Sequence, residues 1–169
     1  MSFDEHNKYI YYLVVDMPGL PTDTLHARAQ YFLKTAYPKT ILKSDNTKAI
    51  TGDGKFIVDD AITGERSEKG EIAYRLNIEF KDQKYRFWLT DFVFTPQLRD
   101  KNGDLVSQPG GDIPLEEITG KLDAKEAGAY LDGAGKFCRK WGDKLKLYMI
   151  RTGEPKKGLA ARKVVTDDW

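Results

Sequence analysis

The sequence predicts an α+β fold in the order β-α-β-β-β-β-α, with two helices on one face of a curved antiparallel sheet. Two stretches have the apolar spacing of amphipathic helices, and the later strands follow one another through short connections, which favours antiparallel pairing. Two helices can cover one face of such a sheet, so the opposite face is expected to remain open to solvent. We expect a single domain over residues 1–150 and a flexible basic tail over residues 151–169.

The first strand is expected at residues 9–16, where aromatic and β-branched residues predominate before Pro18. A helix is expected to begin near Pro21, because a proline, a threonine and an acid suit a helix N-terminus. Pro38 ends this helix, since the residue before a proline is displaced from the helical region. The helix has an apolar stripe with steps of three and four residues: Leu25, Ala29, Phe32, Leu33 and Ala36.

Two further strands are expected at residues 41–44 and 48–59. The second of these contains Gly52 and Gly54, which we interpret as space for a closely packed helix or as the mark of a bulge. A charged loop at residues 64–69 follows.

Residues 71–80 and 84–94 are predicted to form a hairpin around a two-residue turn at Asp82-Gln83. This register brings apolar residues together on one face: Phe80 with Tyr85, Ile78 with Phe87, and Leu76 with Leu89. The other face receives polar pairs and one tryptophan: Glu79 with Arg86, Asn77 with Trp88, and Arg75 with Thr90. A slip of one residue would mix the two sets, so burial should hold the register.

Residues 96–120 are interpreted as a long loop with turns at Asn102-Gly103 and Gly110-Gly111. A second, long helix is expected at about residues 123–150. Several glycines lower its intrinsic propensity, so packing of its apolar stripe must stabilise it.

Three segments resemble the landmarks of the bacterial DUF4468 family, a domain of unknown function: "VVDMPGLPTDTLHARAQYFL", "DNTKAITGDGKF" and "IEFKDQKYRFWLTDF". The matching motifs occur in order over roughly residues 9–96: Pro18-Gly19, Arg28-Ala29, Ile50 with Gly52 and Gly54, and Lys81-Asp82 with Lys84-Tyr85-Arg86. Two residues depart from the pattern. Gln83 replaces a glycine, which argues against a type I′ turn, and Pro21 replaces a Ser or Thr cap, which predicts a shifted helix start.

The resemblance implies a TATA-box-binding-protein-like (TBP-like) fold. It also implies a periplasmic or secreted protein, because members commonly carry export signals. No signal peptide is predicted from the first residues given, because they carry acids and no apolar segment. Its longest apolar run, residues 10–15, is too short to span a bilayer. The family has no established activity, so the resemblance transfers no catalytic residue.

The residues offer no recognisable catalytic chemistry. Cys138 is the one cysteine and is expected on the apolar stripe of the second helix, while His6 and His26 are expected at the surface. We find no metal-ligand cluster, cofactor motif or carboxylate pair suited to acid–base work, so no catalytic residue, metal or cofactor is predicted.

Charge is uneven although the chain's formal net charge is only +1. Residues 136–163 contain ten Lys and Arg against two Asp and Glu, a local +8, which leaves −7 for the rest. The helical part of this basic patch comprises Lys136, Arg139, Lys140, Lys144 and Lys146. It is interpreted chiefly as a solvated helix face, and alternatively as a site for an acidic partner, nucleic acid or anionic lipid.

Trp88 is the unusual residue of the hairpin, because the register places this large aromatic side chain on the open face. The residues proposed for protein contact on that face are Arg75, Asn77, Arg86, Trp88 and Phe92. Aromatic and arginine side chains together are typical of protein-binding hot spots, and an arginine can stack on the indole. The alternative is that Trp88 packs only on cross-strand neighbours, under residues 96–120 or the tail.

The leading hypothesis is a non-catalytic binding or structural module of the bacterial cell envelope, whose open sheet face contacts a protein or a second copy. One alternative is binding of nucleic acid or anionic surfaces through the basic helix and tail. Nucleic acid is disfavoured on the sheet face because acids and bases are mixed there. A second alternative is an enzyme with a cryptic carboxylate site. The sequence leaves the oligomeric state open.

Overall fold

The computed structural model describes residues 1–58, 70–107 and 110–150. The strands are β1 (Ser2–Phe3), β2 (Tyr9–Asp16), β3 (Ile41–Asn46), β4 (Ala49–Val58), β5 (Gly70–Lys81), β6 (Lys84–Arg99), β7 (Leu105–Ser107) and β8 (Ile113–Pro114). The helices are α1 (Thr22–Ala36), the 3₁₀ turn η1 (Leu115–Glu117), α2 (Ile118–Lys121) and α3 (Ala124–Ile150). The predicted loop at residues 64–69 and the predicted tail at residues 151–169 lie outside the described residues.

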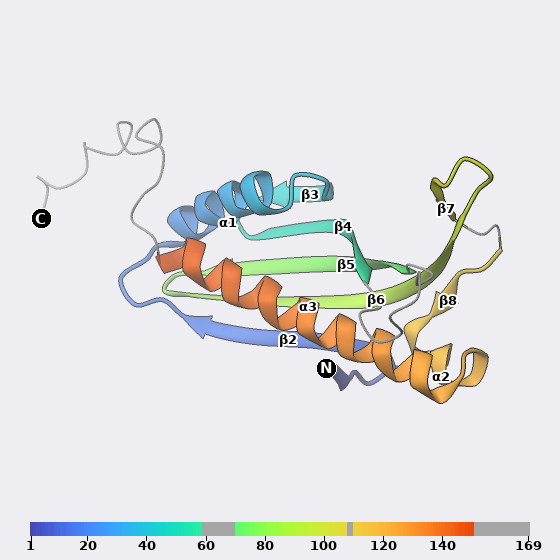
Figure 1. Ribbon diagram of the computed structural model, residues 1–169. Helices are drawn as coiled ribbons and strands as arrows, with labels where there is room; N and C mark the ends of the chain where they lie inside the picture. The colour runs from blue at the N-terminus through green and yellow to red at the C-terminus, as the bar shows by residue number, and fades with distance from the viewer. Residues whose placement is uncertain (59–69, 108–109, 151–169) are drawn as a thin grey trace, which may run out of the picture.

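The strands form one antiparallel sheet in the order β1-β2-β6-β5-β4-β3, and β7 and β8 both pair with β6. The long helices α1 and α3 cross the same face of this sheet (Figure 1). The α+β architecture predicted from the sequence is therefore confirmed, with the helices gathered on one face.

The hairpin register is also confirmed, since Ile78 lies opposite Phe87 and Asn77 lies opposite Trp88. Of the two turn residues, only Gln83 has a positive φ, 64°. A type I′ turn needs a positive φ at both central residues, so the departure from glycine at this position does indicate a different turn.

A bulge in β6 overturns the predicted position of Phe92. The register shifts between Ala73 and Arg75, and Asp91 adopts a left-handed conformation with φ 51°. The extra residue turns Phe92 to the helix-covered side, where it is 1% exposed. The placement of Phe92 on the open face was therefore wrong.

The prediction of a long loop at residues 96–120 was wrong as well. β6 continues to Arg99, and β7, β8, η1 and α2 occupy much of the remainder. The turn at Asn102-Gly103 is present: Gly103 has φ 84°, and the Asp100 carboxylate accepts backbone N–H groups from Asn102 and Asp104. Side-chain capping of this kind lets a short hairpin form without an apolar pattern.

Gly54 does mark a close approach, but the neighbour is a tyrosine rather than a helix. A Cβ built at Gly54 would lie 2.5 Å from the ring of Tyr74, which pairs with it on β5. Gly142 of α3 plays the helix-packing role instead, since a Cβ there would lie 2.9 Å from the Phe87 ring on β6. Glycine in α3 therefore allows the helix to approach the sheet closely, at a cost in helix propensity.

Trp141 of α3 lies where the two helices and the sheet meet. Its ring centroid is 5.1 Å from that of Phe32 on α1 and 5.2 Å from that of Phe87 on β6, and the side chain is fully buried. Packing on both neighbours explains why a glycine-containing helix is stable here.

Candidate functional site

The uncovered sheet face carries an aromatic and aliphatic cluster at its β2 side. Tyr12 lies directly opposite Trp88, and their ring centroids are 6.3 Å apart. Tyr12 is 46% exposed and Val14 is 52% exposed, while Trp88 is half-buried by its neighbours on the sheet. The alternating pattern of β2 explains this exposure, because every second residue of the strand points away from the helices.

Arg86 completes this cluster. Its guanidinium carbon lies 5.7 Å from the centre of the Trp88 ring, within the range of a cation–π interaction. The same guanidinium pairs with the Glu79 carboxylate opposite it on β5. Hydrogen bonding to Glu79 raises the pKa of Arg86 above its usual value. The arginine is thus held over the indole and is already neutralised by an acid.

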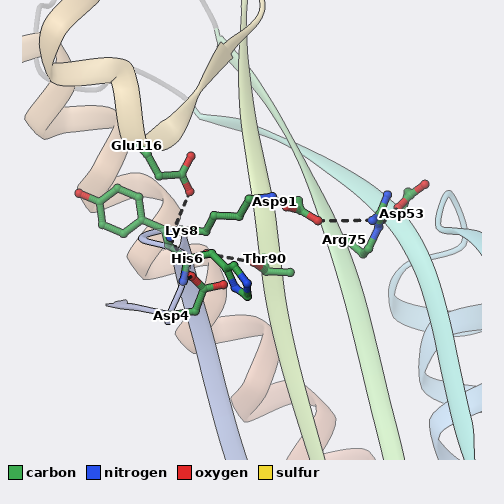
Figure 2. Close-up of polar contacts among 9 residues, drawn as sticks. Asp4, His6, Lys8, Asp53, Arg75, Thr90, Asp91 and Glu116 are labelled. Atoms are coloured by element: carbon green, nitrogen blue, oxygen red, sulfur yellow. Dashed lines mark hydrogen bonds and ion pairs between the residues drawn. The ribbon is translucent and has the colours of Figure 1, made fainter.

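A chain of alternating charges crosses the same face at the level of the β6 bulge (Figure 2). Lys8 pairs with Asp91, whose second carboxylate oxygen lies 3.4 Å from Nη1 of Arg75. Nε of Arg75 lies 3.4 Å from Asp53, which in turn lies 3.5 Å from Nζ of Lys43. The bulge directs Asp91 to this face, so it links the N-terminal segment to the centre of the sheet.

Two hydrogen bonds attach the beginning of β2 beside this chain. The backbone N–H of Tyr9 donates to Glu116 of η1 at 2.8 Å, and the Thr90 hydroxyl donates to the Tyr9 carbonyl at 3.3 Å. Figure 2 shows these contacts converging from β2, β6 and η1. Polar contacts therefore anchor the beginning of β2, where its backbone pairs with β1, and the pairing of β2 with β6 starts at Tyr11.

A groove of about 770 Å³ lies at the hairpin end of the sheet. Tyr12, Val14, Glu79 and Arg86 of the open face line it, together with Asp82 of the turn. The groove extends the aromatic cluster into a concave surface whose lining contains both apolar and charged side chains. Such a mixture suits contact with an amphipathic partner.

The structure brings together four of the five residues proposed for protein contact. Arg75 is exposed, Asn77 and Trp88 are half-buried, and Arg86 is exposed, all on the open face. Phe92 belongs to the core instead.

Sequence reasoning missed Tyr12 and Val14 as parts of this surface. The alternation in residues 9–16 was available as a signal, because it puts Tyr12 and Val14 on the same side of the strand. The sequence does not indicate that this strand pairs with the second strand of the hairpin. The proximity of Tyr12 and Val14 to Trp88 could therefore not be predicted.

The basic residues of α3 lie on the far side of the molecule, where α3 covers the other face of the sheet (Figure 1). Lys136, Arg139, Lys140 and Lys146 are exposed, and none of them has an ion-pair partner among the described residues. Lys144 is half-buried with its ammonium 5.7 Å from the centre of the Tyr37 ring. At 100° per residue the exposed Asp143 falls between Arg139 and Lys136 on the helix surface, which interrupts the positive charge.

The strongest pKa shifts among the described residues belong to buried or half-buried side chains of the core. Burial raises the pKa of the Cys138 thiol to about 12 and that of Tyr37 to about 12. Burial also raises the pKa values of Tyr74 and Tyr85. These shifts have desolvation as their main cause and keep the groups neutral, as expected for core residues.

His26 lies on α1 and its Nε2 is 2.6 Å from a carboxylate oxygen of Asp45 on β3. His26 therefore attaches α1 to the edge strand. Within residues 1–58, 70–107 and 110–150, no group of three or more His, Cys, Asp or Glu side chains is arranged to hold a metal ion.

The fold and the open sheet define a protein of the TBP-like class. The family model described as a domain of unknown function (DUF4468) with TBP-like fold matches residues 11–95. This match spans just over half of the chain, which therefore belongs to the DUF4468 family.

Two solved structures are similar to this chain. A TBP-like protein from Parabacteroides distasonis has a TM-score of 0.66 and 17% identity, over 84% of this chain and 92% of that chain. A DUF4468 family protein from Bacteroides ovatus has a TM-score of 0.64 and 11% identity, over 89% of each chain. At such identities the likeness establishes the fold alone. No curated protein gives a significant match.

In the part of the chain that the structure describes, no helix has both the length and the apolar character needed to cross a lipid bilayer.

Proposed function

We propose that this chain is a non-catalytic binding module whose open sheet face contacts a protein. The observation that carries the proposal is the cluster of the exposed Tyr12 and Val14 with the half-buried Trp88, over whose indole Arg86 is held. Aromatic and arginine side chains at the centre of a contact surface supply much of the binding energy in protein interfaces. An envelope location is part of the proposal and rests on the family resemblance.

The charges of this face favour a protein over a polyanion. Arg75 lies between Asp53 and Asp91, and Arg86 pairs with Glu79, so each arginine of the face already has an acidic partner. Binding to a phosphate backbone requires cations that exchange their counterions for phosphates. A partner that buries the aromatic cluster leaves these ion pairs intact at the rim.

The test is capture of partners from the envelope and soluble fractions of the source cell, at low and moderate salt. The variant is Trp88→Ala, and the matched control is Tyr31→Ala, which removes a partly exposed aromatic ring from α1 on the opposite side of the sheet. We expect a protein that survives moderate salt, is retained by Tyr31→Ala and is lost by Trp88→Ala. A partner that Trp88→Ala retains at full strength would contradict the proposal.

A second candidate function is binding of an anionic surface through α3. The exposed Lys136 and Lys140 lie one helical turn apart, and neither is paired with an acid among the described residues. A partner bound by these cations should be lost at moderate salt, and should be lost by Lys136→Glu with Lys140→Glu. If the Trp88→Ala variant still captures the partner and the double glutamate variant does not, the contact surface is α3 and not the open sheet face. The further alternative of a cryptic carboxylate enzyme remains a hypothesis.

A further inference from the structure

Among the strands that the structure describes, none covers the outer edge of β2 over most of its length. β1 pairs only with Tyr9 and Ile10, while Tyr11–Asp16 pairs with β6 on its inner side. No other described strand borders this segment, and Figure 1 shows β2 at the margin of the sheet. Along such an edge, the N–H and C=O groups of every second residue point outward and can pair with a further strand.

This edge lacks the features that usually prevent strand addition. Tyr11–Val15 contains neither a charge nor a proline, and consists of aromatic, β-branched and leucine residues. The opposite edge, β3, carries Lys43 and Asp45 and has an irregular register between Leu42 and Ser44. Charges and bulges protect edge strands, so the two edges of the sheet differ in their capacity for pairing.

We propose that β2 pairs in antiparallel fashion with β2 of a second copy, forming a continuous sheet across a two-fold axis at Leu13. Directly opposite residues in an antiparallel pair point to the same face of the sheet. The two-fold axis must therefore pass through a residue, because an axis between two residues would set side chains of the open face opposite side chains of the covered face. An axis at Leu13 uses all of Tyr11–Val15. It places Tyr12 opposite Val14 of the second copy and Tyr11 opposite Val15 of the second copy.

These pairs explain the choice of a second copy over an unrelated strand. Aromatic residues opposite β-branched residues are favourable cross-strand pairs, and the segment provides them with itself. No like charges face each other in this register. Asp16 falls opposite Ile10 of the second copy, the residue at which the pairing with β1 starts. The self-complementary segment Tyr11–Val15 thus uses all but the last residue of the part of β2 that β1 leaves free.

The inference goes beyond the proposed function, because it concerns backbone pairing along the outer edge of β2, whereas Trp88 lies on the neighbouring strand β6. Tyr12 and Val14 belong to both surfaces, so the Trp88 variant is the one that distinguishes them. Pairing of one short strand buries less than a standard interface, so we expect a weak, concentration-dependent dimer. Trp88→Ala should therefore leave the dimer intact while abolishing partner capture, which separates failure of one proposal from failure of the other.

The first test is sedimentation equilibrium of the full chain from about 5 to about 500 µM, the range suited to a small interface. The variant is Val14→Lys, and the matched control is Ile41→Lys on the other edge strand. Both residues are β-branched, more than half exposed and on the open face, so each change adds the same charge without disturbing the core. We expect Val14→Lys to weaken the dimer by about tenfold or more and Ile41→Lys to leave it unchanged.

The second test measures the register with a spin label at Asp16→Cys. Asp16 is exposed, whereas the native Cys138 is fully buried and escapes labelling in the folded protein. With the axis at Leu13, the two labelled backbones lie about 20 Å apart, six residues along the strand direction. A dimer with this distance supports the inference. A monomer throughout the concentration range, equal weakening by both lysine variants, or a clearly different distance would overturn it.

Discussion

Asp82 shows how one side chain in the hairpin turn supplies what the helix sequence lacks. Pro21 occupies the N-cap position of α1 and makes no side-chain capping bond. The Asp82 carboxylate instead accepts hydrogen bonds from the Thr22 N–H at 3.0 Å and from the Thr22 hydroxyl at 2.8 Å. Pro21, the departure from the family pattern, is therefore compensated by Asp82, which lies sixty positions from the Thr22 that it caps.

We predict that Asp82→Ala lowers the melting temperature by about 2–4 °C, the effect of losing one helix cap in a chain of this size. The neighbouring exposed residue gives a matched control, Lys81→Ala, which should change the melting temperature little. Thermal unfolding followed by circular dichroism measures both. Equal shifts in the two variants would show that the turn, and not the cap, is responsible.

The same cap gives the stability a dependence on pH. The hydrogen bonds from Thr22 hold the pKa of Asp82 below its usual value in the folded protein. The unfolded chain therefore binds a proton at Asp82 more readily than the folded protein does. The stabilisation that the Asp82 carboxylate provides is present above the unfolded pKa of about 3.9, and it is lost as the pH falls through the lower pKa of the folded protein. We predict that the stability advantage of wild type over Asp82→Asn shrinks between about pH 4 and pH 2 in urea titrations. A stability difference between wild type and Asp82→Asn that stays constant over this pH range would contradict the capping role of Asp82.

At the scale of the elements, the bulge in β6 decides which side chains reach the open face. Without it, Phe92 would follow Trp88 and Thr90 outward, and Asp91 would be turned toward the helices. With it, Phe92 joins the core and Asp91 joins Lys8 and Arg75 on the open face. One extra residue thus provides both an apolar side chain for the core and an acid for the charge chain.

We predict that Asp91→Gly is more stable than Asp91→Val by about 1–2 kcal/mol. Both variants lose the carboxylate and its two ion pairs, so the difference isolates the left-handed conformation at φ 51°. Glycine adopts this conformation freely, whereas a β-branched side chain is strained there. Urea unfolding with a common m-value measures the difference. Equal stability, or a more stable valine variant, would show that β6 can be paired without the bulge.

For the whole molecule, Trp141 holds the helical layer on the sheet. Its fully buried ring contacts Phe32 of α1 and Phe87 of β6, so its loss affects both layers. We predict that Trp141→Ala reduces the free energy of unfolding by about 3–5 kcal/mol, as for other large buried side chains. Leu147→Ala, on the exposed side of α3, should cost less than about 0.5 kcal/mol.

Chemical unfolding of these two variants also tests the arrangement of the layers. If α3 is packed on the sheet as described, the Trp141 variant should lose tertiary structure cooperatively in both helices and sheet. A Trp141→Ala variant as stable as Leu147→Ala would contradict this packing.

Much of the hairpin could be predicted because its information is local. Apolar residues at every second position, on either side of a two-residue turn, admit one register that buries them together, and Ile78 does face Phe87. The bulge also left a trace, since the apolar spacing changes from two residues to three between Leu89 and Phe92. Our prediction continued the two-residue alternation past Leu89, and it therefore placed Phe92 on the wrong face.

The sequence by itself determined the order of the five longer strands and the two long helices, the hairpin register and the presence of a polar face around Trp88. These follow from periodicity and turn chemistry, which act between neighbours in the chain. Only the tertiary structure decided that Tyr12 and Val14 lie beside Trp88 and that Asp82 caps α1. It also decided that no other described strand pairs with the outer edge of β2 beyond Ile10. Each of these depends on which distant segments meet, and local patterns allow several such pairings until the whole core is packed.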